Sequence, residues 1–156
     1  MLHIALFEPE IPPNTGNIIR LCANTGAQLH LIEPLGFALD DKRLRRAGLD
    51  YHEFAHVKQH ANFTEFQHWQ GQRRLFACTT KARQHHHEVS YQDEDILLFG
   101  PESRGLPDSV LGVVPSAFKI RIPMLEDSRS LNLSNATGII LYQAWQQLGF
   151  PGAKTL

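Results

Sequence analysis

Residues 96–107 read ILLFGPESRGLP, a short apolar run that passes directly into a turn rich in glycine and proline. An apolar run of this length, ended by such a turn, predicts a buried β-strand. Gly100, Pro101, Gly105 and Pro107 fix an unusual backbone at the carboxyl end of that strand. Because open α/β sheets bind their ligands at this end of their strands, we expect a binding loop here.

Similar β-rich runs recur on both sides of this stretch: IALF (4–7), LHLI (29–32), RLFACT (74–79) and FKIRIP (118–123). Segments of helical period alternate with these runs: one opening near Asn14, where Asn14 or Thr15 can cap it, and stopped by Gly26, one near 40–47, one near 62–70, a short one after Pro107 and one at about 133–148. This alternation predicts an α/β fold, a mostly parallel sheet with helices on both faces. A chain of 156 residues predicts a single domain over 1–156.

The composition, with 42% hydrophobic and 20% charged residues, is that of an ordinary globular protein. The first apolar run is only about six residues long and lacks a basic flank, so we expect no signal peptide, no membrane span and a cytoplasmic location. Cys22 and Cys78 form no CxxC pair, which argues against a disulfide framework or a cysteine zinc site.

A second polar loop follows the run FKIRIP, where Ser130, Asn132, Ser134 and Asn135 supply four uncharged hydrogen-bonding side chains. A helix cap alone would explain Ser130 or Asn132, but not all four. Together the two loops predict a neutral, polar pocket suited to an adenosine moiety. No GxGxxG follows the first strand and no P-loop occurs, which disfavours a dinucleotide fold, a Rossmann-like methyltransferase and a triphosphate.

The stretches FGPESRGLP and IPMLEDSRSLNLSNA, together with NTGNIIR (14–20), resemble motifs 2, 3 and 1 of the SPOUT (SpoU–TrmD) RNA methyltransferases. The resemblance covers almost the whole chain and extends to the small members that methylate a tRNA wobble nucleotide. Two departures are conservative: Ser103 replaces a threonine and Leu131 a methionine.

This resemblance implies an α/β fold with a deep C-terminal trefoil knot. It also implies S-adenosylmethionine as methyl donor, S-adenosylhomocysteine as product and no metal. The implied reaction is 2'-O-methylation of the wobble nucleotide, a C or modified U at position 34, in leucine tRNAs bound through the anticodon stem-loop. Methylation of another tRNA or rRNA nucleotide is the alternative.

The resemblance also assigns site residues. Cofactor contacts are implied at Cys78, Thr79, Gly100, Pro101, Glu102, Gly105, Ile122, Met124, Ser130, Leu131 and Asn132. Catalysis is implied for Arg20, with Asn14, Glu102 and Asn132 as companions. The role of Arg20 stays open between a base and a phosphate clamp, because a guanidinium with a pKa above about 12 is rarely deprotonated.

The final helix carries two apolar stripes, one of Leu133, Ala136, Ile140 and Ala144 and one of Ile139, Tyr142 and Trp145. A single small core rarely needs both, so we expect a homodimer, which the resemblance also implies. The alternative is burial of both stripes within one chain. The net charge of −1 gives no global signal for nucleic acid, but local basic residues are candidate RNA contacts: Lys42, Arg43, Arg45, Arg46 and Arg104.

A rival interpretation comes from His52-Glu53-Phe54-Ala55-His56, which matches the HExxH signature of zinc hydrolases. Gln59 and Asn62 stand where the metzincin extension of that signature needs glycine and histidine. Residues 85–87 are three consecutive histidines, but adjacent side chains cannot easily face one ion, so a polar loop is favoured. An RNA-binding module without catalysis would lack the two cofactor-type loops.

Overall fold

Six parallel strands form the central sheet of the computed structural model, which describes residues 1–46, 48–54 and 56–156, without the side chains at 41, 43, 44 and 51. The strands are β1 (His3–Phe7), β2 (Gln28–Ile32), β3 (Lys58–His60), β4 (Leu75–Cys78), β5 (Ile96–Phe99) and β6 (Lys119–Ile120). Their order is β3-β2-β1-β5-β4-β6, and every pairing is parallel. The predicted α/β class and parallel sheet are confirmed; β3 was not predicted, and β6 is shorter than the run FKIRIP.

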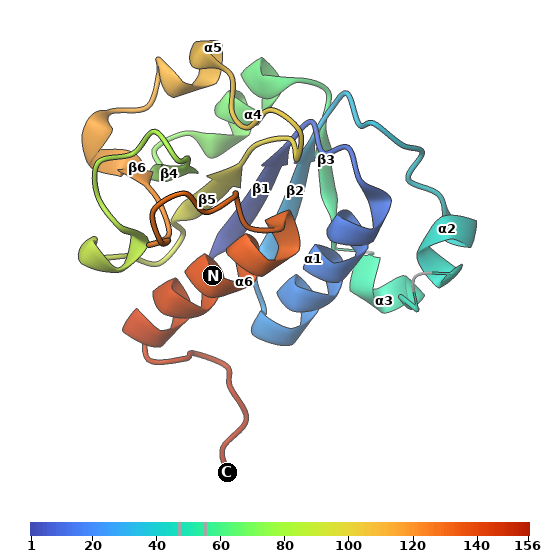
Figure 1. The fold of residues 1–156 in the computed structure, drawn as a ribbon. Helices are drawn as coiled ribbons and strands as arrows, with labels where there is room; N and C mark the ends of the chain where they lie inside the picture. The colour runs from blue at the N-terminus through green and yellow to red at the C-terminus, as the bar shows by residue number, and fades with distance from the viewer. Residues whose placement is uncertain (47, 55) are drawn as a thin grey trace.

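Helices cover both faces of the sheet (Figure 1). They are α1 (Pro12–Thr25), α2 (Asp41–Arg46), α3 (Tyr51–Phe54), α4 (Phe63–Gln70), α5 (Asp108–Leu111) and α6 (Leu133–Gln147), with 3-10 turns η1 (His86–Glu88) and η2 (Ser116–Phe118). The long helices α1 and α6 lie side by side on one face, and α4 and α5 lie on the other. No helix among the described residues is long and apolar enough to cross a membrane.

Strand β1 shows how one sequence serves both faces. Ile4 and Leu6 pack in the core beneath α1 and α6, while Ala5 and Phe7 pack in the core beneath α4 and α5. All four are buried, as side chains of a parallel strand covered on both faces should be. The apolar runs used for prediction are therefore continuous rather than alternating.

Helix α1 begins earlier than predicted and without the expected side-chain cap. Its N-cap is Ile11, and Pro12 and Pro13 occupy the first two helical positions. The prediction of a cap at Asn14 or Thr15 is wrong, because proline lacks the N–H that a cap would satisfy and favours the first turn. The predicted stop is confirmed: Gly26 adopts the left-handed conformation with φ 79°.

Three buried histidines lie in a row across β1, β2 and β3. His3 Nδ1 is 3.0 Å from His30 Nε2, and His30 Nδ1 is 2.9 Å from His60 Nε2. At the outer end, His3 Nε2 lies 3.1 Å from a carboxylate oxygen of Glu94. Since a carboxylate only accepts, each imidazole is neutral and donates through Nε2. The Trp69 ring of α4 covers the row, 4.0 Å from the His30 ring between centroids.

Burial makes this row resistant to protonation. It lowers the pKa values of His3 and His60, and burial together with the neighbouring histidines lowers the pKa of His30 to about 2. Lys58 and Arg73 act in the same direction on His30.

Candidate active site

A cavity of about 630 Å³ opens where the carboxyl ends of β4, β5 and β6 meet the first turns of α1 and α6. Its walls come from segments far apart in the sequence: residues 78–81, 99–106 and 120–133, with Asn14 from α1. β1 lies between β2 and β5, so the strand order changes direction beside this cavity. Ligands of open α/β sheets bind at such a position.

The residues to which the sequence assigned cofactor contacts all line this one cavity. They are Cys78, Thr79, Gly100, Pro101, Glu102, Gly105, Ile122, Met124, Ser130, Leu131 and Asn132. Asn14 lines it as well, so three of the four residues assigned to catalysis are also present.

The loop after β5 closes tightly on itself. A Cβ on Gly100 would lie 2.3 Å from the backbone nitrogen of Leu106, which no side chain permits. The turn is closed by a 2.9 Å hydrogen bond from the Gly105 N–H to the Pro101 carbonyl, and Gly105 has φ 67°. Glycine at 100 is therefore required by close approach, and glycine at 105 by backbone conformation.

Glu102 supplies the cap that the sequence of α1 lacks. Its carboxylate accepts hydrogen bonds from the backbone N–H groups of Glu10 (2.8 Å) and Ile11 (2.7 Å) and from the Asn14 side chain (3.2 Å). A negative charge at a helix N-terminus satisfies free N–H groups and complements the helix dipole. Glu102 thereby anchors the loop after β5 to the start of α1.

Asn132 extends this network to the last helix. Its side-chain nitrogen donates to Asn14 Oδ1 at 3.0 Å, and its oxygen accepts from the N–H groups of Ser134 (2.9 Å) and Asn135 (3.2 Å). Asn132 is thus the N-cap of α6. Glu102, Asn14 and Asn132 form one hydrogen-bonded chain along the cavity wall.

Two acidic residues before α1 hold side chains of this wall in place, although they do not line the cavity themselves, and sequence reasoning missed them. Glu10 accepts from the N–H and the hydroxyl of Ser103 at 2.8 and 2.7 Å, and these bonds lower the pKa of Glu10. Glu8 pairs with Arg104 at 2.9 Å. Arg104, predicted to contact RNA, therefore has an acidic partner within the chain. Nothing in the local sequence near Glu8 indicates a partner almost 100 residues away.

Arg20 lies apart from the cavity, which it does not line. Its guanidinium pairs with the Glu53 carboxylate, with Nε 3.0 Å and Nη2 3.2 Å from the two oxygens, and also donates to the Gly48 carbonyl. The hydrogen bonds to Glu53 raise the pKa of Arg20. The structure therefore does not bring Arg20 together with Asn14, Glu102 and Asn132 within one chain.

The predicted basic cluster is a surface feature of α2. Lys42, Arg45 and Arg46 are exposed, and the side chain of Arg43 lies outside the described residues. Two further basic residues, Lys81 and Arg121, line the cavity itself. Lys81 pairs with Asp108 at 3.1 Å, and Arg121 donates to the Thr80 carbonyl at 2.8 Å. Neither residue is among the predicted RNA contacts.

The HEFAH segment does not form the helix that a zinc hydrolase needs. α3 ends at Phe54, and Ala55 lies outside the described residues. The carboxylate of Glu53 is engaged by Arg20, and His60 lies on β3 in the buried histidine row. HExxH requires both histidines on one helical face, so the hydrolase interpretation is wrong here.

Both cysteines are free, as predicted. Cys22 is buried in the core, and burial raises the pKa of its thiol to about 12. Burial raises the pKa of the Cys78 thiol as well. A thiol held protonated is a poor nucleophile, so the cavity contains no activated cysteine among its described walls.

Comparison with known proteins identifies the family. The model of the SpoU rRNA methylase family matches residues 1–142. A tRNA (cytidine(34)-2'-O)-methyltransferase from Escherichia coli (strain K12) is 65% identical over 153 residues, which cover 98% of both chains.

Solved structures agree with this match. One, concerned with the 2-OH methylation of C/U34 on tRNA, is 44% identical with a TM-score of 0.88 and covers 96% of this chain and 97% of that chain. An AdoMet-bound rRNA methyltransferase from Sinorhizobium meliloti is 28% identical with a TM-score of 0.81, over 94% of this chain and 56% of that chain.

Proposed function

The chain belongs to the SpoU rRNA methylase family, and we propose that it methylates the 2'-oxygen of nucleotide 34, a C or a modified U, in tRNA. The activity is that of a tRNA (cytidine(34)-2'-O)-methyltransferase. The observation that carries this conclusion is the convergence of the loops after β5 and β6, together with Asn14 of α1, on one cavity at the carboxyl ends of the strands. The high identity to the Escherichia coli enzyme over nearly the full length supports the same nucleotide.

The methyl donor that fits this cavity is S-adenosylmethionine, which supplies a methyl group bound to a positively charged sulfur. The volume lies within the range of small-molecule sites, and the walls combine apolar side chains with neutral polar groups and a few charged side chains. The tight turn at Gly100, which leaves no room for a Cβ, sets the path of the backbone along this wall. We assign donor binding to the residues of the loop after β5, to Ile122 and Met124, and to Ser130 through Asn132.

The chain's own residues prepare the acceptor side. Glu102, Asn14 and Asn132 hold the two loops and the two helix N-termini in a fixed relation, so the reacting groups can be positioned without reorganisation. Arg20 acts as a phosphate clamp rather than as a base, because its pairing with Glu53 raises its pKa and makes deprotonation harder.

The position of Arg20 outside the cavity supports a shared site in a homodimer. The second apolar stripe of α6 is accessible in the single chain, with Ile139 42% and Tyr142 44% exposed. Trp145 packs against Tyr142 beside it. An exposed apolar face of this kind marks a protein interface. We infer that a second copy packs there and contributes its own Arg20 to this cavity.

Three finer features belong to the same proposal: the deep trefoil knot, leucine tRNAs as substrates and recognition of the anticodon stem-loop. The knot is supported by the path of the chain, since residues 121–132 leave the edge strand β6 and return past the loop after β5 to α6. The exposed basic residues of α2 supply phosphate contacts for the stem-loop.

The test is direct. The protein is incubated with labelled S-adenosylmethionine and anticodon stem-loops of leucine and other tRNAs, and the methylated ribose is mapped. Methylation at nucleotide 34 is expected, and it should be lost when that nucleotide carries 2'-deoxyribose. Label on a base or at another nucleotide would contradict the proposal, and equal labelling of all stem-loops would contradict the leucine assignment.

A further inference from the structure

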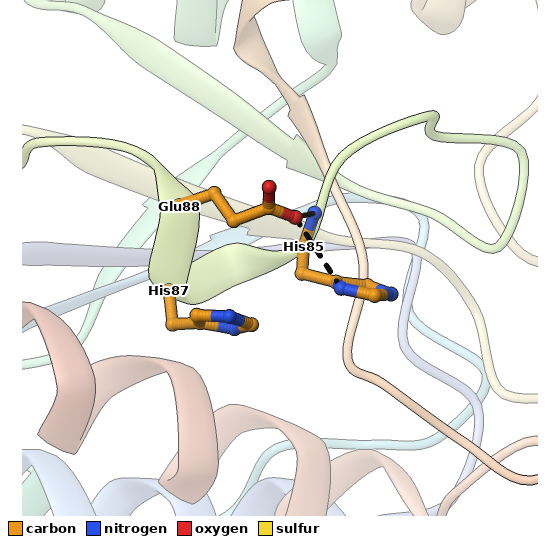
Figure 2. A group of neighbouring side chains, drawn as sticks. All are labelled: His85, His87 and Glu88. Atoms are coloured by element: carbon orange, nitrogen blue, oxygen red, sulfur yellow. Dashed lines mark hydrogen bonds and ion pairs between the residues drawn. The ribbon is translucent and has the colours of Figure 1, made fainter.

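Outside the cavity, His85, His87 and Glu88 bring three metal-ligating side chains together (Figure 2). One nitrogen from each histidine and one carboxylate oxygen of Glu88 all lie within 4.8 Å of one another. Among the described residues, this is the one group of three or more such side chains gathered so closely. The cluster plays no part in the cavity walls.

The backbone around this cluster explains how adjacent histidines can share a ligand. His86 is buried, and its N–H donates to the Arg121 carbonyl at 2.8 Å while its carbonyl accepts from the Tyr91 hydroxyl. With His86 turned inward, His85 and His87 both face solvent, and their rings lie 21° from parallel with centroids 5.6 Å apart. The objection that three adjacent histidines cannot face one ion therefore holds only for His86, and Glu88 takes the third place.

We propose that His85, His87 and Glu88 form a surface site for a divalent transition ion of the zinc class. Two imidazoles and one carboxylate are the ligand types that zinc, nickel and copper prefer, whereas magnesium and calcium prefer oxygen ligands alone. Zinc–ligand bonds of about 2.0–2.2 Å place neighbouring tetrahedral ligand atoms about 3.4 Å apart. The side chains of His85 and Glu88 are 44% and 52% exposed, so they can rotate to bring their ligand atoms to this separation.

The metal-free turn is already close to the arrangement that an ion needs. Glu88 accepts from the His85 N–H at 2.8 Å, and the same oxygen lies 3.3 Å from His85 Nδ1. The oxygen nearest His85 is therefore the one that caps the turn (Figure 2), and a carboxylate oxygen has a further lone pair that it can offer to the ion. The turn is tied to the strand region by the parallel bridge between His85 and Arg121, so only side chains have to move.

An ion at this turn would stabilise one end of the segment that links β4 to η1. The other end of that segment, Thr79 to Lys81, lines the cavity. The site lies outside the methyl-transfer machinery, so the inference stands independently of the proposed function. We expect it to contribute to stability and not to turnover.

Titration of ZnCl2 into tag-free, EDTA-treated protein by calorimetry tests the site. Wild type should bind one ion per chain, and His87→Ala and Glu88→Gln should each weaken binding at least about tenfold. The matched control is His68→Ala, because His68 and Glu65 form an exposed pair of the same i,i+3 spacing, 3.8 Å apart, without a second histidine. Its affinity should equal that of wild type.

Three results would overturn the site: no zinc binding by wild type at about 100 μM, wild-type affinity in both His87→Ala and Glu88→Gln, or loss of binding in His52→Ala but not in His87→Ala. Equal affinity for MgCl2 would contradict the ion class. Melting temperatures in EDTA should be the same for wild type and His87→Ala, since His87 is exposed, and addition of ZnCl2 should raise only that of wild type.

Discussion

The polar side chains in the two halves of the sheet are arranged differently. Across β1, β2 and β3, the histidine row bonds to itself and ends on Glu94 beneath α4. Across β5, β4 and β6, the polar chain of Glu102, Asn14 and Asn132 ends on backbone N–H groups just before α1 and in the first turn of α6, and a cavity stays open beside it. In the first arrangement, the closed half, the polar side chains bond to one another and stabilise the core. In the second, the open half, they fix the walls of a site and leave room for a ligand.

Gly100→Ala is expected to have the largest effect, because it displaces the loop after β5, which forms one wall of the cavity. The new Cβ would lie 2.3 Å from the Leu106 nitrogen, so the loop after β5 has to move. A displacement of about 1 Å in a positioned site can cost about 100-fold in rate. We expect methyl transfer to fall by about that factor, measured with labelled S-adenosylmethionine and a stem-loop substrate.

Gly105→Ala is the matched control for this change. A Cβ there meets nothing within 4 Å, although φ 67° imposes strain of about 1–2 kcal/mol. Its activity should stay well above that of Gly100→Ala at equal folded fraction. If both variants lose activity equally, backbone strain rather than closure of the loop is responsible.

Acid should weaken the closed half before the open one. The pKa values of His3, His30 and His60 lie below the ordinary 6.5 in the folded chain, so the unfolded chain binds more protons as the pH falls below 6.5. Their stabilisation is therefore complete above pH 6.5 and is lost progressively below it, by up to about 1.4 kcal/mol per pH unit for each histidine. Glu94, whose pKa is about 2, adds its own loss only below 4.5.

Urea denaturation between pH 7.5 and 5 measures this loss. His30→Gln keeps a donor and an acceptor but cannot titrate. The slope of its free energy of unfolding against pH should therefore be smaller by about the contribution of one histidine. His68→Gln changes an exposed histidine and should leave the slope unaltered. A slope unchanged in His30→Gln would show that the row is not the acid-sensitive element.

Glu102→Gln should weaken the hydrogen bonds that hold the cavity wall without adding any atom that would occupy the cavity. The amide replaces one acceptor oxygen with a donor that faces the N–H groups of Glu10 and Ile11. Leaving such a group unsatisfied costs about 1–3 kcal/mol. We expect that loss in urea denaturation together with weaker donor binding, while Glu126→Gln, at an exposed position, should change neither. A free energy of unfolding equal to that of wild type in Glu102→Gln would contradict the capping role of Glu102.

The sequence predicts the parts of this fold that depend on local pattern. Strands such as β1 and β5 are continuous apolar runs because both faces of the sheet are covered. β3 escapes such prediction, because of its three residues only His60 is buried. The two cavity loops are predicted because each follows a strand whose carboxyl end lies at one edge of the sheet, whereas the individual contact residues come from the resemblance to the SPOUT family.

Pairings over long sequence distances are not encoded locally, and these are what sequence reasoning misses. Glu102 caps a helix that begins 90 residues earlier in the chain, which no capping pattern near α1 could indicate. Glu53 stands within a zinc-protease signature but serves as the partner of Arg20. In both cases the sequence shows that the residue is a carboxylate but does not show which residue it contacts.

Glu53→Gln is expected to have the smallest effect, because the pair it breaks lies outside both networks and is partly open to solvent. The Arg20 side chain is 50% exposed and that of Glu53 18%. Exposed ion pairs contribute little, so we expect kcat/KM for the stem-loop to fall only about two- to fivefold, with donor binding unchanged. Arg20→Ala should lose far more, because the clamp itself is gone, and Glu65→Gln on α4 should lose nothing. If Glu53→Gln matches Arg20→Ala, the carboxylate does more than hold the guanidinium; if Arg20→Ala keeps normal turnover with intact donor binding, Arg20 is neither clamp nor base.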